Sequence, residues 1–141
     1  MQPLDLDALL HSEHPDASFH DSELDAIDID FQSGRGRLHF RIPVGITDGE
    51  QVLVPGCLVL TGVLLIAAQP PQNPSAEWSG QSLWITAEGT WPPPDLQSTF
   101  TLPSDLPEEA FCHYLFASNT NAYWVISART AEFVWDEAEG K

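Results

Sequence analysis

Two stretches of alternating apolar and polar residues flank a glycine-rich turn, and they constrain the fold of this chain more than any other feature. In Ala26–Gln32 the apolar residues alternate with aspartate, and in Arg37–Val44 they alternate with arginine and histidine. A repeat of two is typical of a β-strand with one buried face. The Ser-Gly-Arg-Gly segment between them is typical of a turn. The pattern therefore predicts an antiparallel hairpin over residues 24–44.

A register for this hairpin follows if Ser33–Gly36 is the loop. Asp28 then faces Arg41, and opposite charges meet on the solvent side, worth a few tenths of a kcal/mol per pair. The other predicted pairs are Asp30–His39, Gln32–Arg37, Ile27–Ile42, Ile29–Phe40 and Phe31–Leu38, the last three on the core side. The parity of the pattern changes between Leu24 and Ile27, which predicts a bulge near Asp25-Ala26.

The rest of the chain also indicates strands, separated by segments rich in proline and glycine. A short helix capped by Asp5 is expected first. Strands are expected in residues 52–68, divided in two near Pro55-Gly56, in 81–89, in 98–102, and in three segments of 111–135. The prediction is a mainly β fold of about seven or eight strands, an antiparallel sandwich or half-open barrel. Residues 1–141 form one domain, with an acidic tail at 136–141 expected to fray.

Charge is the extreme property of the composition. The chain has 141 residues with 21 acids against five bases, a net charge of −16, and the first thirty residues hold nine acids and no lysine or arginine. Such a field repels nucleic acid and anionic membranes. It favours association with a basic protein. The alternative is that the acids only keep the protein soluble.

The apolar segments give no sign of export or membrane insertion. The N-terminus lacks the basic start and cleavage site of a signal peptide, and the longest apolar run, Cys57–Ala68, is too short to span a bilayer. We therefore expect a cytoplasmic protein with free thiols at Cys57 and Cys112. Leu58–Ile66 is apolar on both faces, which predicts cover by the protein itself or by a second subunit in a homodimer.

The segment HSEHPDASFHDSE (residues 11–23) gathers histidines and carboxylates. A metal site using His11, His14, His20 and Asp21 is one hypothesis, because these residue types suit zinc or iron. Their spacing matches no established pattern, and Pro15 separates the histidines into different elements. We therefore predict no metal and no other cofactor.

A structural role for this segment is the stronger interpretation. Phe19 would hold the loop to the core, and the polar residues would satisfy the backbone where the chain turns into its first strand. If the acidic N-terminal region meets a basic partner, the residues predicted to contact it are Asp16, His20, Asp21, Glu23 and Asp25.

Catalytic motifs are absent from the sequence. It contains no nucleophile elbow, no phosphate-binding loop and no Cys-His pair at a known spacing. Trp78, Trp84 and Trp91 flank the proline-rich loops, and such aromatics could bind a carbohydrate or another small ligand. Packing in a β core is the more common role for tryptophan in strands.

The segment SFHDSELDAIDIDFQSGRGRLHFRI resembles the opening of a loose group of small, mostly uncharacterised bacterial proteins. Its one sharp motif is Phe19-His20-Asp21, followed by a strand, a glycine turn and a second strand. Some such proteins are placed among the immunity proteins of bacterial toxin systems, and the resemblance implies no catalytic residues. We therefore expect a non-enzymatic protein-binding domain that neutralises a basic partner. The alternatives are a metal-dependent enzyme and a small-ligand or carbohydrate-binding domain.

Overall fold

The chain is mainly β in the computed structural model, which describes residues 3–71, 82–93 and 105–136. A single 3-10 turn, η1 (Asp7–Leu9), stands where a short helix was expected. No helix among the residues that the structure describes is long and apolar enough to cross a membrane. The strands are β1 (Ser22–Asp30), β2 (Arg35–Thr47), β3 (Glu50–Ala68), β4 (Leu83–Thr90), β5 (Phe111–Ala117) and β6 (Ala122–Trp135).

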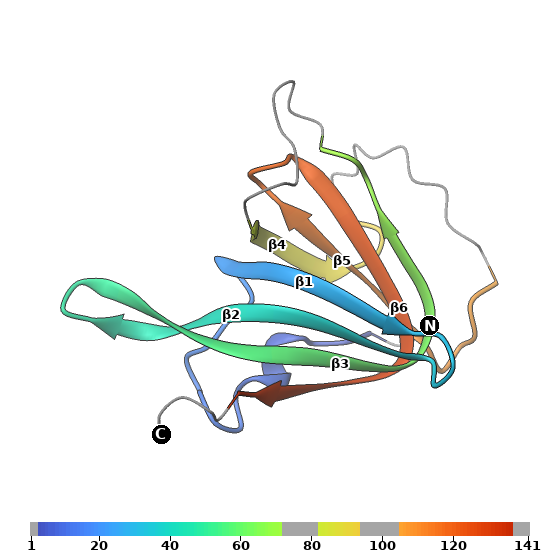
Figure 1. Ribbon diagram of the computed structural model, residues 1–141, viewed down its shortest axis with the longest axis horizontal. Coiled ribbons are helices and arrows are strands. Elements are labelled where there is room, and N and C mark those ends of the chain that lie inside the picture. The colour runs from blue at the N-terminus through green and yellow to red at the C-terminus, as the bar shows by residue number, and fades with distance from the viewer. Residues whose placement is uncertain (1–2, 72–81, 94–104, 137–141) are drawn as a thin grey trace.

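These strands form one curled antiparallel sheet in the order β1-β2-β3-β6-β5-β4 (Figure 1). The sheet returns on itself where Ser22–Leu24 of β1 pairs with Leu83–Ile85 of β4. The mainly β prediction is therefore confirmed. The two-sheet sandwich and the count of seven or eight strands are not confirmed, because the described residues form six strands in a single sheet.

The described residues hold fewer strands than expected, in part because two long strands each continue through an expected break. β3 runs on through Pro55-Gly56, since Pro55 lies just beyond the end of the β3–β6 pairing, where a proline costs least. β6 runs on through Arg129-Thr130, opposite Gly62 with its left-handed φ of +69°, and the pairing register shifts a little further along β3, between Val63 and Leu65. The strand expected at 98–102 lies outside the described residues.

The hairpin of β1 and β2 exists, but its predicted register is wrong by four residues. Asp28 faces Arg37 rather than Arg41, and Asp30 faces Arg35. The turn comprises residues 31–34 instead of 33–36, because Gly34 takes a left-handed φ of +72° and its N–H donates to the Asp30 carbonyl at 2.9 Å. The predicted bulge is confirmed, since the register shifts between Leu24 and Ala26.

This shift also changes which apolar side chains reach the core. The predicted core residues of β2 are buried, namely Leu38, Phe40 and Ile42. On β1 the prediction was wrong for two residues: Ile29 lies opposite Gly36 and is 38% exposed, and Phe31 falls in the turn and is 89% exposed. The last part of β1 is therefore far less covered than the first.

The N-terminal segment covers one end of the core. Leu6, Leu10 and Phe19 are fully buried. The Phe19 ring packs edge-on against the rings of Phe40 and Phe133, at centroid distances of 5.0 and 5.8 Å. Figure 1 shows this segment beneath β3, beside the end of β6. The sheet therefore closes at this end around aromatic side chains.

Neither cysteine forms a disulfide, as predicted. Cys112 is buried and Cys57 is half-buried, and burial raises the pKa of both thiols. At neutral pH both therefore remain protonated, in which form a thiol is a poor nucleophile.

Candidate functional site

The histidines of residues 11–23 point to different partners. The His11 ring nitrogen Nε2 lies 3.0 Å from the Ala17 carbonyl, and the His14 ring packs on Trp135 with centroids 4.4 Å apart. His20 is exposed, and its Nδ1 lies 3.3 Å from a carboxylate oxygen of Asp21. No group of three or more histidine, cysteine, aspartate or glutamate side chains among the described residues is placed to hold a metal ion. The loop therefore does not assemble the hypothetical ligand set.

The same segment is held in place by Asp7, which sequence reasoning had not singled out. One oxygen of its carboxylate accepts the Phe19 N–H at 2.8 Å, and the other accepts the Ser18 hydroxyl at 3.1 Å. The buried Ser22 hydroxyl then donates to the Phe19 carbonyl at 2.7 Å. Asp21 takes a left-handed φ of +72° as the chain turns into β1. These contacts support the structural interpretation of the loop.

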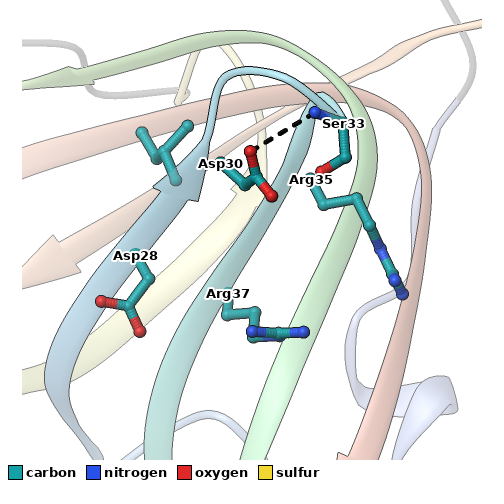
Figure 2. Close-up of a pocket in the computed structure, with 6 residues that line it drawn as sticks. Asp28, Asp30, Ser33, Arg35 and Arg37 are labelled. Carbon is teal, nitrogen blue, oxygen red and sulfur yellow. Dashed lines mark hydrogen bonds between the residues drawn. The ribbon is translucent and has the colours of Figure 1, made fainter.

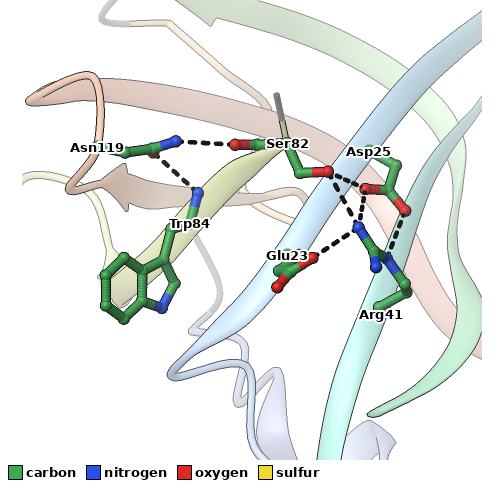
Figure 3. A network of polar contacts seen from close by, with 6 residues as sticks. All are labelled: Glu23, Asp25, Arg41, Ser82, Trp84 and Asn119. Atoms are coloured by element: carbon green, nitrogen blue, oxygen red, sulfur yellow. Dashed lines mark hydrogen bonds and ion pairs between the residues drawn. The ribbon is translucent and has the colours of Figure 1, made fainter. Parts of the chain in front are cut away.

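Two of the predicted partner-binding acids are already engaged inside the protein. Arg41 contacts Glu23 at 2.6 Å through Nη2 and Asp25 at 3.0 Å through Nε (Figure 3). The Ser82 hydroxyl donates to Asp25 as well. Burial alone would raise the pKa of the Asp25 carboxyl, but the hydrogen bonds from Arg41 and Ser82 outweigh it and hold that pKa below its ordinary value. Of the other predicted contact residues, Asp16 and His20 are exposed and Asp21 is half-buried.

A second part of this network fastens β4 to the β5–β6 turn. The Asn119 side chain accepts the Trp84 N–H at 2.9 Å and donates to the Ser82 carbonyl at 2.8 Å (Figure 3). Because Ser82 also reaches Asp25, a chain of polar contacts crosses the junction where β4 meets β1. Its role is to close the sheet.

The tryptophans do not form a binding platform in the described part of the chain. Trp84 is 50% exposed, whereas Trp91 is half-buried and packs edge-on against Tyr123 at 6.5 Å. The two lie at opposite ends of β4, so they cannot stack on one sugar ring. Trp78 lies outside the described residues.

The most exposed aromatic residue of the described chain is Phe31, at the turn between β1 and β2. A hollow of about 400 Å³ adjoins it. Its lining is mostly aliphatic and consists of Ile29, Asp30, Phe31, Gly34 and Val63–Ile66. Leu64 is itself 37% exposed. We call this surface, formed by Ile29, Phe31 and Leu64, the Phe31 patch.

Charged side chains stand beside the Phe31 patch in two rows. A hollow of about 270 Å³ lies among Asp28 and Asp30 of β1, Ser33 of the turn, and Arg35 and Arg37 of β2 (Figure 2). Neither arginine forms an ion pair within 4 Å in the described residues, although each faces an aspartate across the strands.

The two aspartates of these rows have different contacts. Asp28 lies 2.8 Å from Nε2 of His39. Asp30 accepts the backbone N–H groups of Gln32 and Ser33 at 3.0 and 3.4 Å, and these bonds hold the pKa of Asp30 below its ordinary value. Asp30 therefore stays ionised at neutral pH and fixes the turn that displays Phe31.

An acid–base pair of a buried histidine and a half-buried glutamate lies elsewhere in the sheet. His113 Nε2 is 2.5 Å from a carboxylate oxygen of Glu88, and its Nδ1 has no hydrogen-bond partner among the described residues. Such a pair could move a proton, but the His113 side chain is only 2% exposed, so no substrate atom can touch it in this state. The two residues are 25 positions apart, and no sequence motif links them. We assign the pair to the packing of β4 against β5.

No family model, no curated protein and no solved structure matches this chain.

Proposed function

We propose that this chain is a non-enzymatic protein-binding domain, and that the Phe31 patch is its binding surface. The observation that supports this best is the exposure of Phe31, at 89%. Burying a phenylalanine side chain stabilises a protein by roughly 1.5–3 kcal/mol, and this fold leaves that contribution unused. Aromatic side chains at the centre of an apolar patch with a polar rim are the usual hot spots of protein interfaces.

The charge of the molecule supports a basic partner. The net charge is −16, and Asp28 and Asp30 stand directly beside the Phe31 patch. Long-range attraction would speed the approach of a basic protein, and apolar contact with Phe31 would then hold it. Arg35 and Arg37, which form no ion pair with any described residue, are placed to select a partner that also offers a carboxylate.

Neutralisation of a basic toxin, as in immunity-type proteins, is the specific form of this function that we propose. It is supported by the resemblance at Phe19-His20-Asp21 and by the acidic charge. A cytoplasmic location and a homodimer are further parts of the proposal. The alternatives have less support, because the described histidines are dispersed and Trp84 and Trp91 lie at opposite ends of β4.

Site-specific photo-crosslinking tests this function. A benzophenone amino acid would replace Phe31 and, as a matched control, Ile46, which is also apolar and 73% exposed but lies near the β2–β3 turn. In cells of the source organism, irradiation should join the Phe31 derivative to a basic protein. Excess unlabelled wild-type protein should suppress this crosslinked product, and excess unlabelled Ile46→Ala protein should suppress it equally.

A Phe31→Ala competitor should fail to suppress the product while keeping the wild-type thermal midpoint. Equal crosslinking from both positions, or equal competition by the Phe31→Ala and wild-type proteins, would show that the Phe31 patch is not the binding surface.

A further inference from the structure

Among the residues that the structure describes, the second half of β1 is paired on one side only, and its other side is a free edge. On one side β1 pairs with β2 along its length, from Glu23 to Asp30. On the other side it pairs with β4 only over Ser22–Leu24. Within residues 3–71, 82–93 and 105–136, no strand pairs with residues 26–30 on that side. The pairing with β4 ends at the bulge near Asp25, and a bulge is a common device for ending a ladder.

A free edge presents backbone N–H and C=O groups that a strand of another protein can pair with. This edge adjoins the Phe31 patch, because Phe31 follows β1 directly and Ile29 belongs to both. A partner that covers Phe31 therefore lies within reach of the edge.

The side chains along the edge specify what kind of strand fits. Asp28 and Asp30 point to one face of β1, whereas Ile27 and Ile29 point to the other, because successive residues of a strand alternate. In an added strand, residues opposite β1 have their Cβ atoms about 4.5–5.5 Å from those of β1. The arginines of β2 lie one strand further away, at about 10 Å. The charge next to an added strand is therefore negative.

We propose that the free edge of β1 accepts a strand from the partner in which lysine or arginine alternates with apolar residues. The basic residues face Asp28 and Asp30, and the apolar residues face Ile27, Ile29 and Phe31. This inference rests on the proposed function and specifies how the partner is bound. A second copy of the chain fits less well than a basic strand, because pairing β1 with β1 sets aspartate opposite aspartate or, in a register slipped by one residue, opposite isoleucine.

A synthetic peptide tests this mode of binding on the full-length protein. The probe is the capped heptapeptide Lys-Val-Lys-Val-Lys-Val-Lys. Its first control is the same peptide with every backbone nitrogen methylated, which keeps the side chains and charges but cannot form a strand ladder. Its second control replaces each lysine with glutamate. Either control peptide should bind at least about tenfold more weakly than the lysine heptapeptide. Only the lysine heptapeptide should slow hydrogen exchange of the amides at 26–30.

Two charge variants separate the local aspartates from net charge. The double variant Asp28→Asn, Asp30→Asn should weaken the lysine peptide by roughly two- to thirty-fold, the range for two cross-strand charge pairs. The amide introduced at position 30 keeps an oxygen acceptor for the turn N–H groups. The control Glu132→Gln, Asp136→Asn changes the net charge equally, at exposed positions on and after β6, and should alter binding by less than about twofold.

The inference is overturned if the methylated peptide binds as tightly as its parent, if no amide of residues 26–30 gains protection, or if the lysine peptide does not bind at millimolar concentration. The aspartates would then serve only to keep other strands off the edge. Crosslinking at Phe31 in that event would still support the proposed function, by a different docking mode. Peptide protection without crosslinking at Phe31 would keep the edge and overturn the assignment of the patch.

Discussion

The two ends of β1 contain similar charged residues, but these residues form different contacts at each end. At the first end, Arg41 contacts both Glu23 and Asp25, and Ser82 joins them from the segment before β4. At the second end, Arg35 and Arg37 face aspartates but make no ion pair within 4 Å in the described residues. The first end pairs with a third strand, β4, whereas the second end has no third strand beside it within the described residues. The ion pairs of Arg41 therefore lie where three strands meet, whereas Arg35 and Arg37 lie where β1 has only β2 beside it in the described residues.

The phenylalanines of the two ends show the same contrast and should differ most when they are truncated. Phe19 is fully buried and Phe31 is 89% exposed. We expect Phe19→Ala to lower the free energy of unfolding by roughly 3–5 kcal/mol, because it leaves a cavity in the core. Phe31→Ala should change it by no more than about 0.5 kcal/mol. Urea unfolding followed by tryptophan fluorescence measures both, and similar losses would contradict the contrast.

Asp7 should be the next most sensitive position, because its carboxylate fixes the loop that enters β1. Asp7→Ala removes the acceptor of the Phe19 N–H and the Ser18 hydroxyl, which we expect to cost about 1–3 kcal/mol. Asp16→Ala, an exposed acid of the same segment, is the matched control and should cost less than about 0.5 kcal/mol. If both variants unfold at the same urea concentration, the loop is not held by Asp7.

The arginines of β2 sharpen the contrast within one strand. Arg41→Gln breaks contacts with Glu23 and Asp25 and should lower the free energy of unfolding by roughly 1–2 kcal/mol. Arg37→Gln makes the same chemical change at the open end and should lower it by less than about 0.5 kcal/mol. Thermal unfolding by circular dichroism compares them. If Arg37→Gln lowered the free energy of unfolding more than Arg41→Gln, the end of β1 that the ion pairs stabilise would be the one near Arg37, against this interpretation.

The contacts of the Asp25 carboxylate should also make a pH-dependent contribution to stability, smaller than the effects of the substitutions above. The folded pKa of Asp25 lies below its unfolded value, so its contribution is complete above about pH 3.9 and is lost as pH falls through the folded pKa. Protonation of the many other carboxylates also changes stability, so the comparison needs an Asp25→Asn variant. The stability difference between wild type and Asp25→Asn should be constant near neutrality and shrink below about pH 4. A difference that grows on acidification would refute this sign.

The hairpin shows how far the sequence alone can predict this fold. Alternation in both arms correctly predicted two paired strands, and the change of parity correctly predicted the bulge near Asp25. The register could not be chosen, because placing Asp28 opposite Arg41 or opposite Arg37 satisfies the charges equally well. The left-handed conformation at Gly34 determines the register. The sequence does not specify it, because a segment with two glycines allows more than one such turn.

The candidate site was missed for the same reason. The predicted register placed Phe31 opposite Leu38 in the core, so its exposure was not foreseen. The long strands were also divided wrongly, because Pro55-Gly56 and Arg129-Thr130 are breaks by composition but lie within continuous pairing. Pairing between distant strands decides these points, and a local pattern carries no information about it.

Amide hydrogen exchange along β1 in the free protein tests most directly whether its two ends differ. Glu23 and Leu24 have strands on both sides, so their amides should be protected, and the Ser22 amide should be protected because it donates to the Phe19 carbonyl. Residues 26–30 have only β2 beside them in the described chain, so amides directed at β2 should be protected and those directed at the free edge should exchange rapidly. NMR should resolve alternating fast and slow exchange over residues 26–30 and uniformly slow exchange over residues 22–24. Uniform protection along the whole of β1 would contradict it, because the edge would then already be occupied.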